Sequence, residues 1–191
     1  MAINDRKHRE LMTKYIEYIE QSNKEYFPDI KFEIEKPYNY YGSRGFIDVL
    51  FSAGERTTSI CEVKPVLYNL GEALRQLRRA HDAILNNVIT DFKINDIIYL
   101  RLVTNFNEEN IEIIENSYPI LKNVDNLVIE LYCDYNDEFY MINSKIISNY
   151  YIEKYGDPLL LRWEMCKNKE SESDIKALFR AKKNLFLKDN R

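Results

Sequence analysis

Two strand-like segments joined by a short turn limit the folds that this chain can adopt. Residues 45–51 and 58–64 are apolar runs rich in β-branched and aromatic side chains, and turn-forming residues, Gly54 among them, lie between the two runs. Because a short connection joins strands that run antiparallel, the two segments are predicted to form a β-hairpin. The charged residues that interrupt or end these apolar runs are Asp48, Glu62 and Lys64.

Helices and further strands surround the predicted hairpin. Helical segments show apolar residues at helical spacing, and Asn69 is a good N-cap because an acidic residue follows it by three positions. Strands covered on both faces show nearly continuous apolar sequence. The predicted order is a helix at 4–23, a half-buried strand at 31–36, a tyrosine-rich turn at 37–43, the hairpin strands, a helix from Asn69, a strand at 96–103, a short acidic helix at 108–116 and a strand at 127–133.

This order of elements predicts an α/β domain with a mixed central β-sheet and helices on both faces. We assign residues 1–143 to that domain. Residues 144–191 show helical spacing without strand-like runs, so a helical C-terminal extension is predicted there. Its basic residues, expected either to contact DNA or only to face solvent, are Lys176, Arg180, Lys182, Lys183 and Lys188.

The charged residues of the hairpin are predicted to converge. Side chains of a strand alternate between its faces, so Glu62 and Lys64 share one face. If Phe51 pairs with Ser59, the same register places Asp48 directly opposite Glu62. A Glu-x-Lys sequence alone is common on exposed strand edges, but strands disfavour aspartate, and an aspartate within an apolar strand points to a function.

Two neighbouring carboxylates repel each other and are costly to keep ionised where water is partly excluded. A hard divalent cation removes this cost, and Mg²⁺ or Mn²⁺ prefers one or two carboxylates together with water and phosphate oxygens. Hydrolysis of a phosphodiester needs such an ion, which activates water and stabilises the developing charge. The pattern therefore predicts a phosphodiesterase centre that uses Mg²⁺, with Mn²⁺ as a substitute, and a Lys64 that orients the water and offsets phosphate charge.

The acidic balance of the chain restricts the class of partner. The formal net charge is −4 and the sequence pI is about 5.4, whereas proteins that hold nucleic acid by charge alone are usually basic. This excludes a simple electrostatic DNA binder but not an enzyme whose site is itself a carboxylate cluster.

The cysteines and histidines indicate the cellular compartment of the protein and whether it binds zinc. The three cysteines, Cys61, Cys133 and Cys166, are far apart without a C-x-x-C motif, which favours reduced thiols in a cytoplasmic protein. The N-terminal residues do not resemble a secretion signal, and no apolar run is long enough for a membrane span, so no membrane partner is expected. His8 and His81 have no cysteine neighbours in sequence, so no zinc site is expected and neither is assigned any chemistry.

An acidic residue in one strand, Glu-x-Lys in the next and a following helix with a glutamine resemble the PD-(D/E)XK nuclease superfamily, which includes restriction endonucleases, archaeal Holliday-junction resolvases and RecB-like nucleases. The resemblance covers residues 4–103 and implies an αβββαβ restriction-endonuclease-like core. It implies that Asp48 and Glu62 bind the metal together with the backbone carbonyl of Val63, and that Lys64 is the catalytic lysine. Ile47 stands where the family's name-giving proline would be.

The resemblance also implies two further site residues. Gln76 resembles the glutamine that follows the core motif in RecB-like members, although Ala80 stands where their tyrosine would be. Many members use an upstream glutamate, for which Glu35 on the first strand and Glu10 on the first helix are the candidates. Glu35 is preferred because it ends the polar face of its strand, close to the start of the next one.

Basic residues near the predicted centre are expected to contact phosphates. Arg79 shares a helix face with Gln76, Arg75 extends the same patch, and Arg44 lies beside the tyrosine-rich turn. The resulting hypothesis is a metal-dependent nuclease that hydrolyses DNA rather than RNA. Because its basic surface is modest, we expect either an endonuclease that selects a nucleic-acid structure such as a junction or flap, or a homodimer that pools two basic patches. The alternatives are a catalytically inactive nucleic-acid-binding or assembly module on the same fold, and an RNA-directed nuclease.

Overall fold

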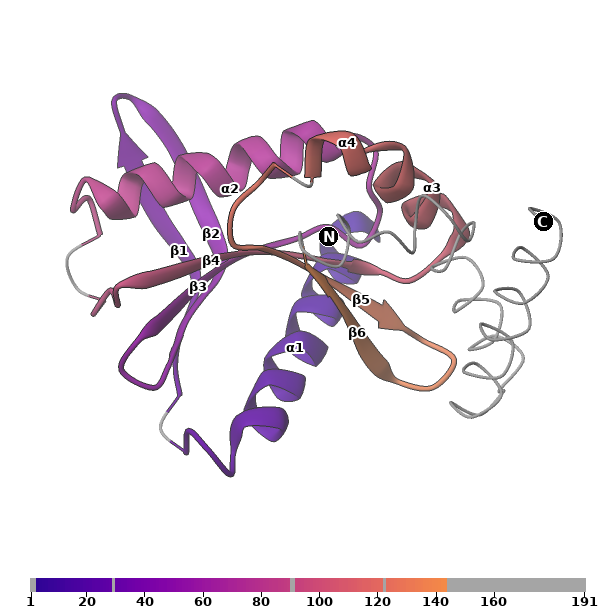
Figure 1. Cartoon of the computed structure of the whole chain (residues 1–191), viewed down its shortest axis with the longest axis horizontal. Helices are drawn as coiled ribbons and strands as arrows, with labels where there is room; N and C mark the ends of the chain where they lie inside the picture. The colour runs from indigo at the N-terminus through magenta and orange to yellow at the C-terminus, as the bar shows by residue number, and fades with distance from the viewer. Residues whose placement is uncertain (1–2, 29, 90–91, 122, 144–191) are drawn as a thin grey trace, which may run out of the picture.

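The computed structural model describes residues 3–28, 30–89, 92–121 and 123–143 (Figure 1). The predicted C-terminal extension, with its basic residues and Cys166, lies outside the described residues. The described elements are α1 (Ile3–Asn23), β1 (Lys31–Tyr40), β2 (Ser43–Ala53), β3 (Thr57–Val63), α2 (Leu70–Leu85), β4 (Ile97–Asn105), α3 (Glu108–Asn116), α4 (Tyr118–Leu121), β5 (Leu127–Cys133) and β6 (Glu138–Asn143).

The strands of the described region form one mixed sheet in the order β1-β2-β3-β4-β5-β6. The first three strands are an antiparallel meander, β3, β4 and β5 run parallel, and β6 returns antiparallel to β5. A parallel pair needs a crossover connection, which α2 supplies between β3 and β4 and which α3 and α4 supply between β4 and β5. The predicted α/β class and the mixed central sheet are therefore confirmed.

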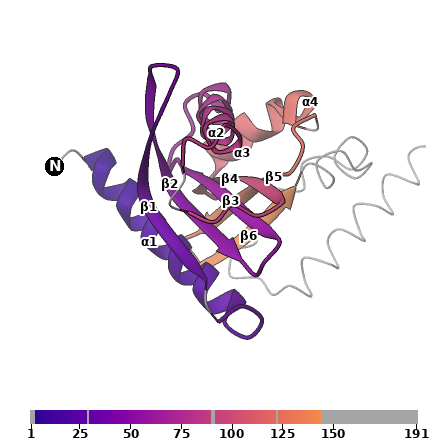
Figure 2. The same cartoon turned by 90° about the vertical axis from the view of Figure 1, so that its left-hand side faces the viewer.

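Helices cover both faces of the sheet, as predicted (Figure 2). On one face, α1 packs Tyr15 and neighbouring apolar residues against Val49 and Val63. On the other, the predicted apolar stripe of α2, which includes Leu77, packs against β3 and β4 at residues such as Ile60. None of the helices in the described ranges is long and apolar enough to cross a membrane.

The prediction of a turn at residues 37–43 was wrong. β1 continues to Tyr40 and β2 begins at Ser43, so the turn is only Tyr41 and Gly42, both with positive φ, 47° and 78°. Two such residues give the tight turn whose twist matches a hairpin. A proline is tolerated at position 37 because β1 is an edge strand of the sheet.

The longer hairpin extends beyond its neighbours in the sheet. Residues 43–47 of β2 pair with β1 alone, and Figure 1 shows this end of β1 and β2 projecting past α2. Two further elements were not predicted. The edge strand β6 is partly exposed and lacks a continuous apolar run, and α4 spans only four residues.

The segment that follows β3 is held by one buried side chain, that of Asn110 at the start of α3. Its Oδ1 accepts a hydrogen bond from the Leu67 backbone N–H at 2.8 Å, and its Nδ2 donates to the Pro65 carbonyl at 3.0 Å. The same amide donates to Thr104 Oγ1 and to the Asn105 carbonyl, both at 2.8 Å. Asn110 therefore ties the β3–α2 connection to the end of β4.

Replacing Asn110 with alanine is expected to lower the free energy of unfolding by about 2–4 kcal/mol, because buried backbone groups of Pro65 and Leu67 lose their partners. Urea unfolding measures the change. The control is Asn123→Ala, because Asn123 is exposed and donates only to the nearby Pro119 carbonyl. Equal effects of the two substitutions would contradict the assigned role.

Candidate functional site

β2 and β3 separate from each other at the predicted centre. Their ladder contains the pair of Phe51 with Ser59, which was assumed from the sequence, and ends at Val49 opposite Cys61. Beyond that pair, β2 is bonded only to β1 and β3 only to β4. The same register places Asp48 and Glu62 at the next position, where the two strands open.

The Asp48 carboxylate occupies this opening. Its Oδ2 accepts a hydrogen bond of 2.7 Å from the Val63 backbone N–H, which the ended ladder with β2 leaves without a backbone partner. The side chain is only 13% exposed, so the bond lies in a place with little water. In an extended strand the N–H and C=O of one residue point to the same side, so the Val63 carbonyl faces β2 as well.

Glu62 and Lys64 form an ion pair on the other side of the same opening. Lys64 Nζ contacts Glu62 Oε1, and Glu62 is buried whereas Lys64 is one-third exposed. Burial, and then the negative charge of Asp48, raise the pKa of Glu62 to about 7 despite the opposing effect of Lys64. The two carboxyl groups therefore repel each other in a poorly hydrated place, as the sequence predicted.

His8 is a member of the site that sequence reasoning missed. Its Nε2 lies 3.2 Å from Asp48 Oδ2, and the hydrogen bond to Asp48 raises the His8 pKa against the opposing effect of burial. His8 comes from the first turns of α1, far from β2 in sequence. No local pattern marks such a residue, because the contact exists only once α1 packs across the sheet.

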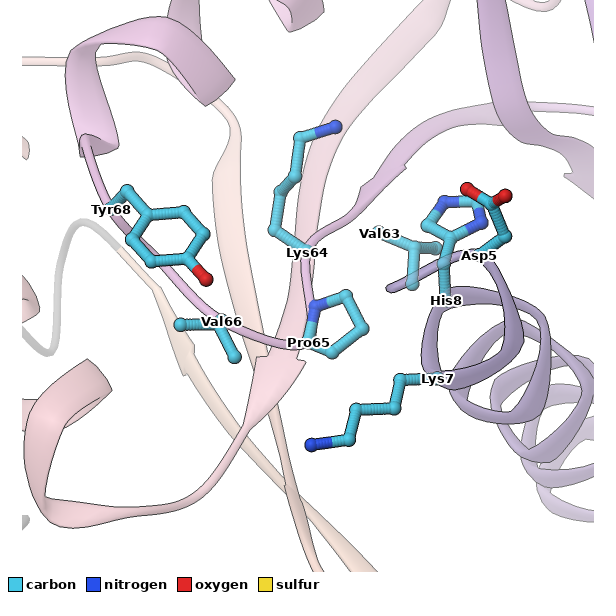
Figure 3. A pocket seen from close by; sticks show the side chains of 8 residues that line it. All are labelled: Asp5, Lys7, His8, Val63, Lys64, Pro65, Val66 and Tyr68. Carbon is cyan, nitrogen blue, oxygen red and sulfur yellow. The ribbon is translucent and has the colours of Figure 1, made fainter. Parts of the chain in front are cut away.

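A pocket of about 250 Å³ adjoins the ion pair between Lys64 and Glu62. Figure 3 shows it between the first turns of α1 and the connection that follows β3. We call it the Lys64 pocket. Its lining residues are Asp5, Lys7, His8, Val63, Lys64, Pro65, Val66 and Tyr68.

Gln76 lies on α2, which covers the sheet face opposite α1. Its side-chain Oε1 is buried and has no hydrogen-bond partner among the described residues. Tyr38 is also buried on this side, where its ring lies over Gly45: a Cβ there would come within 2.6 Å of Tyr38 Cζ. Burial and the charge of Glu62 raise the Tyr38 pKa, whereas Arg79 lowers it.

The two candidate upstream glutamates differ in position. Glu35 faces Asp48 in the register of β1 and β2, but its side chain is exposed and its φ is 49°, an uncommon value for a residue other than glycine. Glu10 is exposed and bonded to Arg6 at 2.7 Å. The structure thus brings the backbone of Glu35 next to the site and keeps Glu10 at the surface of α1.

The predicted nucleic-acid contacts are all exposed. Arg75 and Arg79 lie on α2, where Arg75 pairs with Glu72, and Arg44 lies near the tip of the β1–β2 hairpin. None of the three lines the Lys64 pocket.

The donor atoms at the opening between β2 and β3 are oxygens, which suit a hard cation better than they suit zinc. In the described part of the chain, no group of three or more His, Cys, Asp and Glu side chains is arranged to hold a metal ion. Asp48 and Glu62 instead supply two carboxyl groups, and Val63 supplies a carbonyl on the same side. Mg²⁺ commonly takes one or two carboxylates and fills its other positions with water and phosphate.

The raised pKa of Glu62 predicts how stability depends on pH in the presence of a chelator. The pKa of Glu62 is about 7 in the folded state and ordinary in the unfolded state. At a pH between these two pKa values, the folded state keeps a proton that the unfolded state has lost. The free energy of unfolding should therefore fall by about 1–3 kcal/mol as the pH rises from 5 to 7.5. His8, whose pKa is also raised, acts in the same direction.

Glu62→Gln isolates the contribution of Glu62, because the other titrating groups are common to both proteins. The difference in unfolding free energy between variant and wild type, measured by urea unfolding across this pH range, should grow in favour of the variant as pH rises. A difference that does not change with pH would show that Glu62 ionises normally.

Comparison with protein-family models finds no matching family, and no curated protein or solved structure matches the chain significantly. The role of the site is therefore inferred from its own geometry and chemistry.

Proposed function

We propose that this protein is a metal-dependent nuclease with a PD-(D/E)XK-type core, in which Asp48, Glu62 and Lys64 form the phosphodiesterase centre. One observation carries the proposal: where β2 and β3 part, two carboxyl groups and an ammonium group meet, and the buried carboxyl of Glu62 has a raised pKa beside Asp48. A purely structural cluster has no need of two repelling acids.

The order of elements supports this proposal. α1 is followed by the meander β1–β2–β3, then by α2 and by β4 parallel to β3. That order agrees with the αβββαβ core that the resemblance in residues 4–103 implies. The charged residues lie where β2 and β3 part, next to the C-terminal end of the central strand β3, a common location for ligand sites in α/β sheets.

The residues present fit a hard divalent cation. Asp48 and Glu62 would hold it with carboxylate oxygens, the carbonyl of Val63 faces the same opening, and a cation would relieve the repulsion that raises the Glu62 pKa. When bound, Mg²⁺ or Mn²⁺ supplies an activated water and stabilises negative charge on the phosphate.

The remaining groups position the substrate. Lys64 carries a positive charge beside the two acids, so it can offset the charge of the phosphate that is cut. His8 holds the Asp48 carboxylate in place through the hydrogen bond to its Oδ2. The resemblance favours DNA over RNA as substrate, and a homodimer that makes paired cuts stays a prediction.

The proposal predicts cleavage of nucleic acid that depends on both the metal and Lys64. Purified protein should cut DNA with Mg²⁺ or Mn²⁺ and stop when EDTA is added. Lys64→Ala should lower kcat by about 100-fold or more, because it removes charge stabilisation at the phosphate. Lys93→Ala is the matched control, since Lys93 is exposed and lines a different pocket.

A panel of single strand, duplex, flap and four-way junction, each as DNA and as RNA, identifies the substrate. Cleavage of RNA alone would favour the RNA-directed alternative. If wild type and Lys64→Ala bind nucleic acid equally well without metal and neither cuts it, the protein is the inactive binding module rather than a nuclease.

Metal binding itself is expected without substrate. Mn²⁺ or Mg²⁺ at concentrations above its dissociation constant should raise the melting temperature of wild type, because a ligand that binds only the folded state stabilises it. Asp48→Asn and Glu62→Gln should each abolish this metal-dependent rise. The control Asp134→Asn, which alters an exposed acid outside the site, should retain it. A rise of the same size in all four proteins would place the cation elsewhere.

A further inference from the structure

We propose that the Lys64 pocket binds a second phosphate of the nucleic-acid strand, next to the phosphate that is cut. This inference rests on the proposed function and adds a subsite to the same centre. The pocket lies beside Asp48 and Glu62 rather than between them: neither acid lines it, whereas their respective partners His8 and Lys64 do.

The decisive side chain is that of Lys7. Among the described residues, Lys64 is paired with Glu62 and His8 with Asp48, but no hydrogen bond or ion pair to a described residue engages the Lys7 ammonium. In Figure 3 the Lys7 side chain reaches from α1 toward Pro65 on the opposite wall, away from Asp5. It is therefore a positive charge that no described residue neutralises.

Tyr68 supplies a second donor on the wall opposite α1. Its side chain is exposed, and in Figure 3 its hydroxyl points toward Val66 and Pro65, whereas the Lys64 ammonium points the other way. Lys7 and Tyr68 thus line the same pocket beside the centre. Both are hydrogen-bond donors, and phosphate oxygens are strong acceptors.

The walls suit the rest of a nucleotide. Val63, Pro65 and Val66 give the pocket an apolar lining, against which a sugar can pack, and its volume of about 250 Å³ exceeds what a phosphate alone requires. The backbone of this wall is anchored by Asn110, which bonds the Pro65 carbonyl and the Leu67 N–H. A site formed before binding loses less entropy when its ligand enters.

The test is steady-state cleavage of an oligonucleotide by the full chain with Mg²⁺. Lys7→Ala should raise KM by about five- to tenfold with kcat changed less than about twofold, and should reduce the salt dependence of binding by about one phosphate contact. Tyr68→Phe should raise KM by a smaller factor. The matched control is Arg6→Ala, which removes the same charge one residue away, from a side chain bonded to Glu10 and outside the pocket.

The phosphate has two sources, an internal diester or a terminal monophosphate, and the substrates distinguish them. If the pocket holds a terminal phosphate, Lys7→Ala should raise KM for linear strands with a 5′- or 3′-phosphate. It should leave KM unchanged for the same strands with terminal hydroxyls and for circular strands. If it holds an internal diester, Lys7→Ala should weaken all of these substrates equally. Either pattern supports the pocket, whereas a Lys7→Ala effect no larger than that of Arg6→Ala on every substrate overturns it.

Failure of the subsite and failure of the nuclease proposal give different results. If wild type cuts in a manner that depends on Lys64 but not on Lys7, only the subsite is wrong. If wild type cuts nothing, binding of the same oligonucleotides to wild type, Lys7→Ala and Arg6→Ala, measured by fluorescence anisotropy, still decides the pocket: a loss of affinity specific to Lys7→Ala supports it, and equal affinities overturn it.

Discussion

The hydrogen bond from the Val63 N–H to Asp48 is the interaction on which this site depends. A sheet whose strands part leaves backbone donors without partners, and a buried donor without a partner is costly. The Asp48 carboxylate satisfies that donor at 2.7 Å and so lets β2 and β3 open without exposing the ladder to water. The opening in turn leaves room for the carboxyl groups of Asp48 and Glu62 and brings His8 from α1 into contact with the same carboxylate.

The two buried acidic residues of the described region, Glu62 and Glu130, have different surroundings. Glu130 on β5 is buried beneath α1, but Arg101 donates to it at 2.5 Å and also bonds Ser59 Oγ at 3.0 Å, so this pair is part of the core. Glu62 has a lysine partner that is one-third exposed and an acid as its neighbour. Burial raises the pKa of both carboxyl groups, but only at Glu62 does a second carboxyl group add to the effect. A cation can therefore gain more binding energy at Glu62 than at Glu130.

Much of the fold and the centre of the site could be predicted because their signals are local. Alternation along a strand sets which side chains share a face, and the short connection after Ala53 favours an antiparallel pair. The register of Phe51 with Ser59 was an assumption, and the structure contains that pair. The apolar stripe of α2 and its N-cap Asn69 are equally local, and the Asn69 side chain accepts a bond from the Glu72 N–H. Signals failed where burial was partial, as in the edge strand β6, and where a tight turn carried aromatic residues.

By itself, the sequence determined the α/β class, the hairpin and the shared strand face of Glu62 and Lys64, because each follows from periodicity and from the short connections between strands. The position of Asp48 opposite Glu62 depended on an assumed register, which the structure supplied. Only the tertiary structure decided that His8 contacts Asp48, that Asn110 anchors the wall of the pocket, and that Lys7 and Tyr68 line the same pocket. These contacts join segments that are distant in the chain. Their formation depends on how α1 and α3 pack against the ends of β3 and β4, which no local pattern encodes.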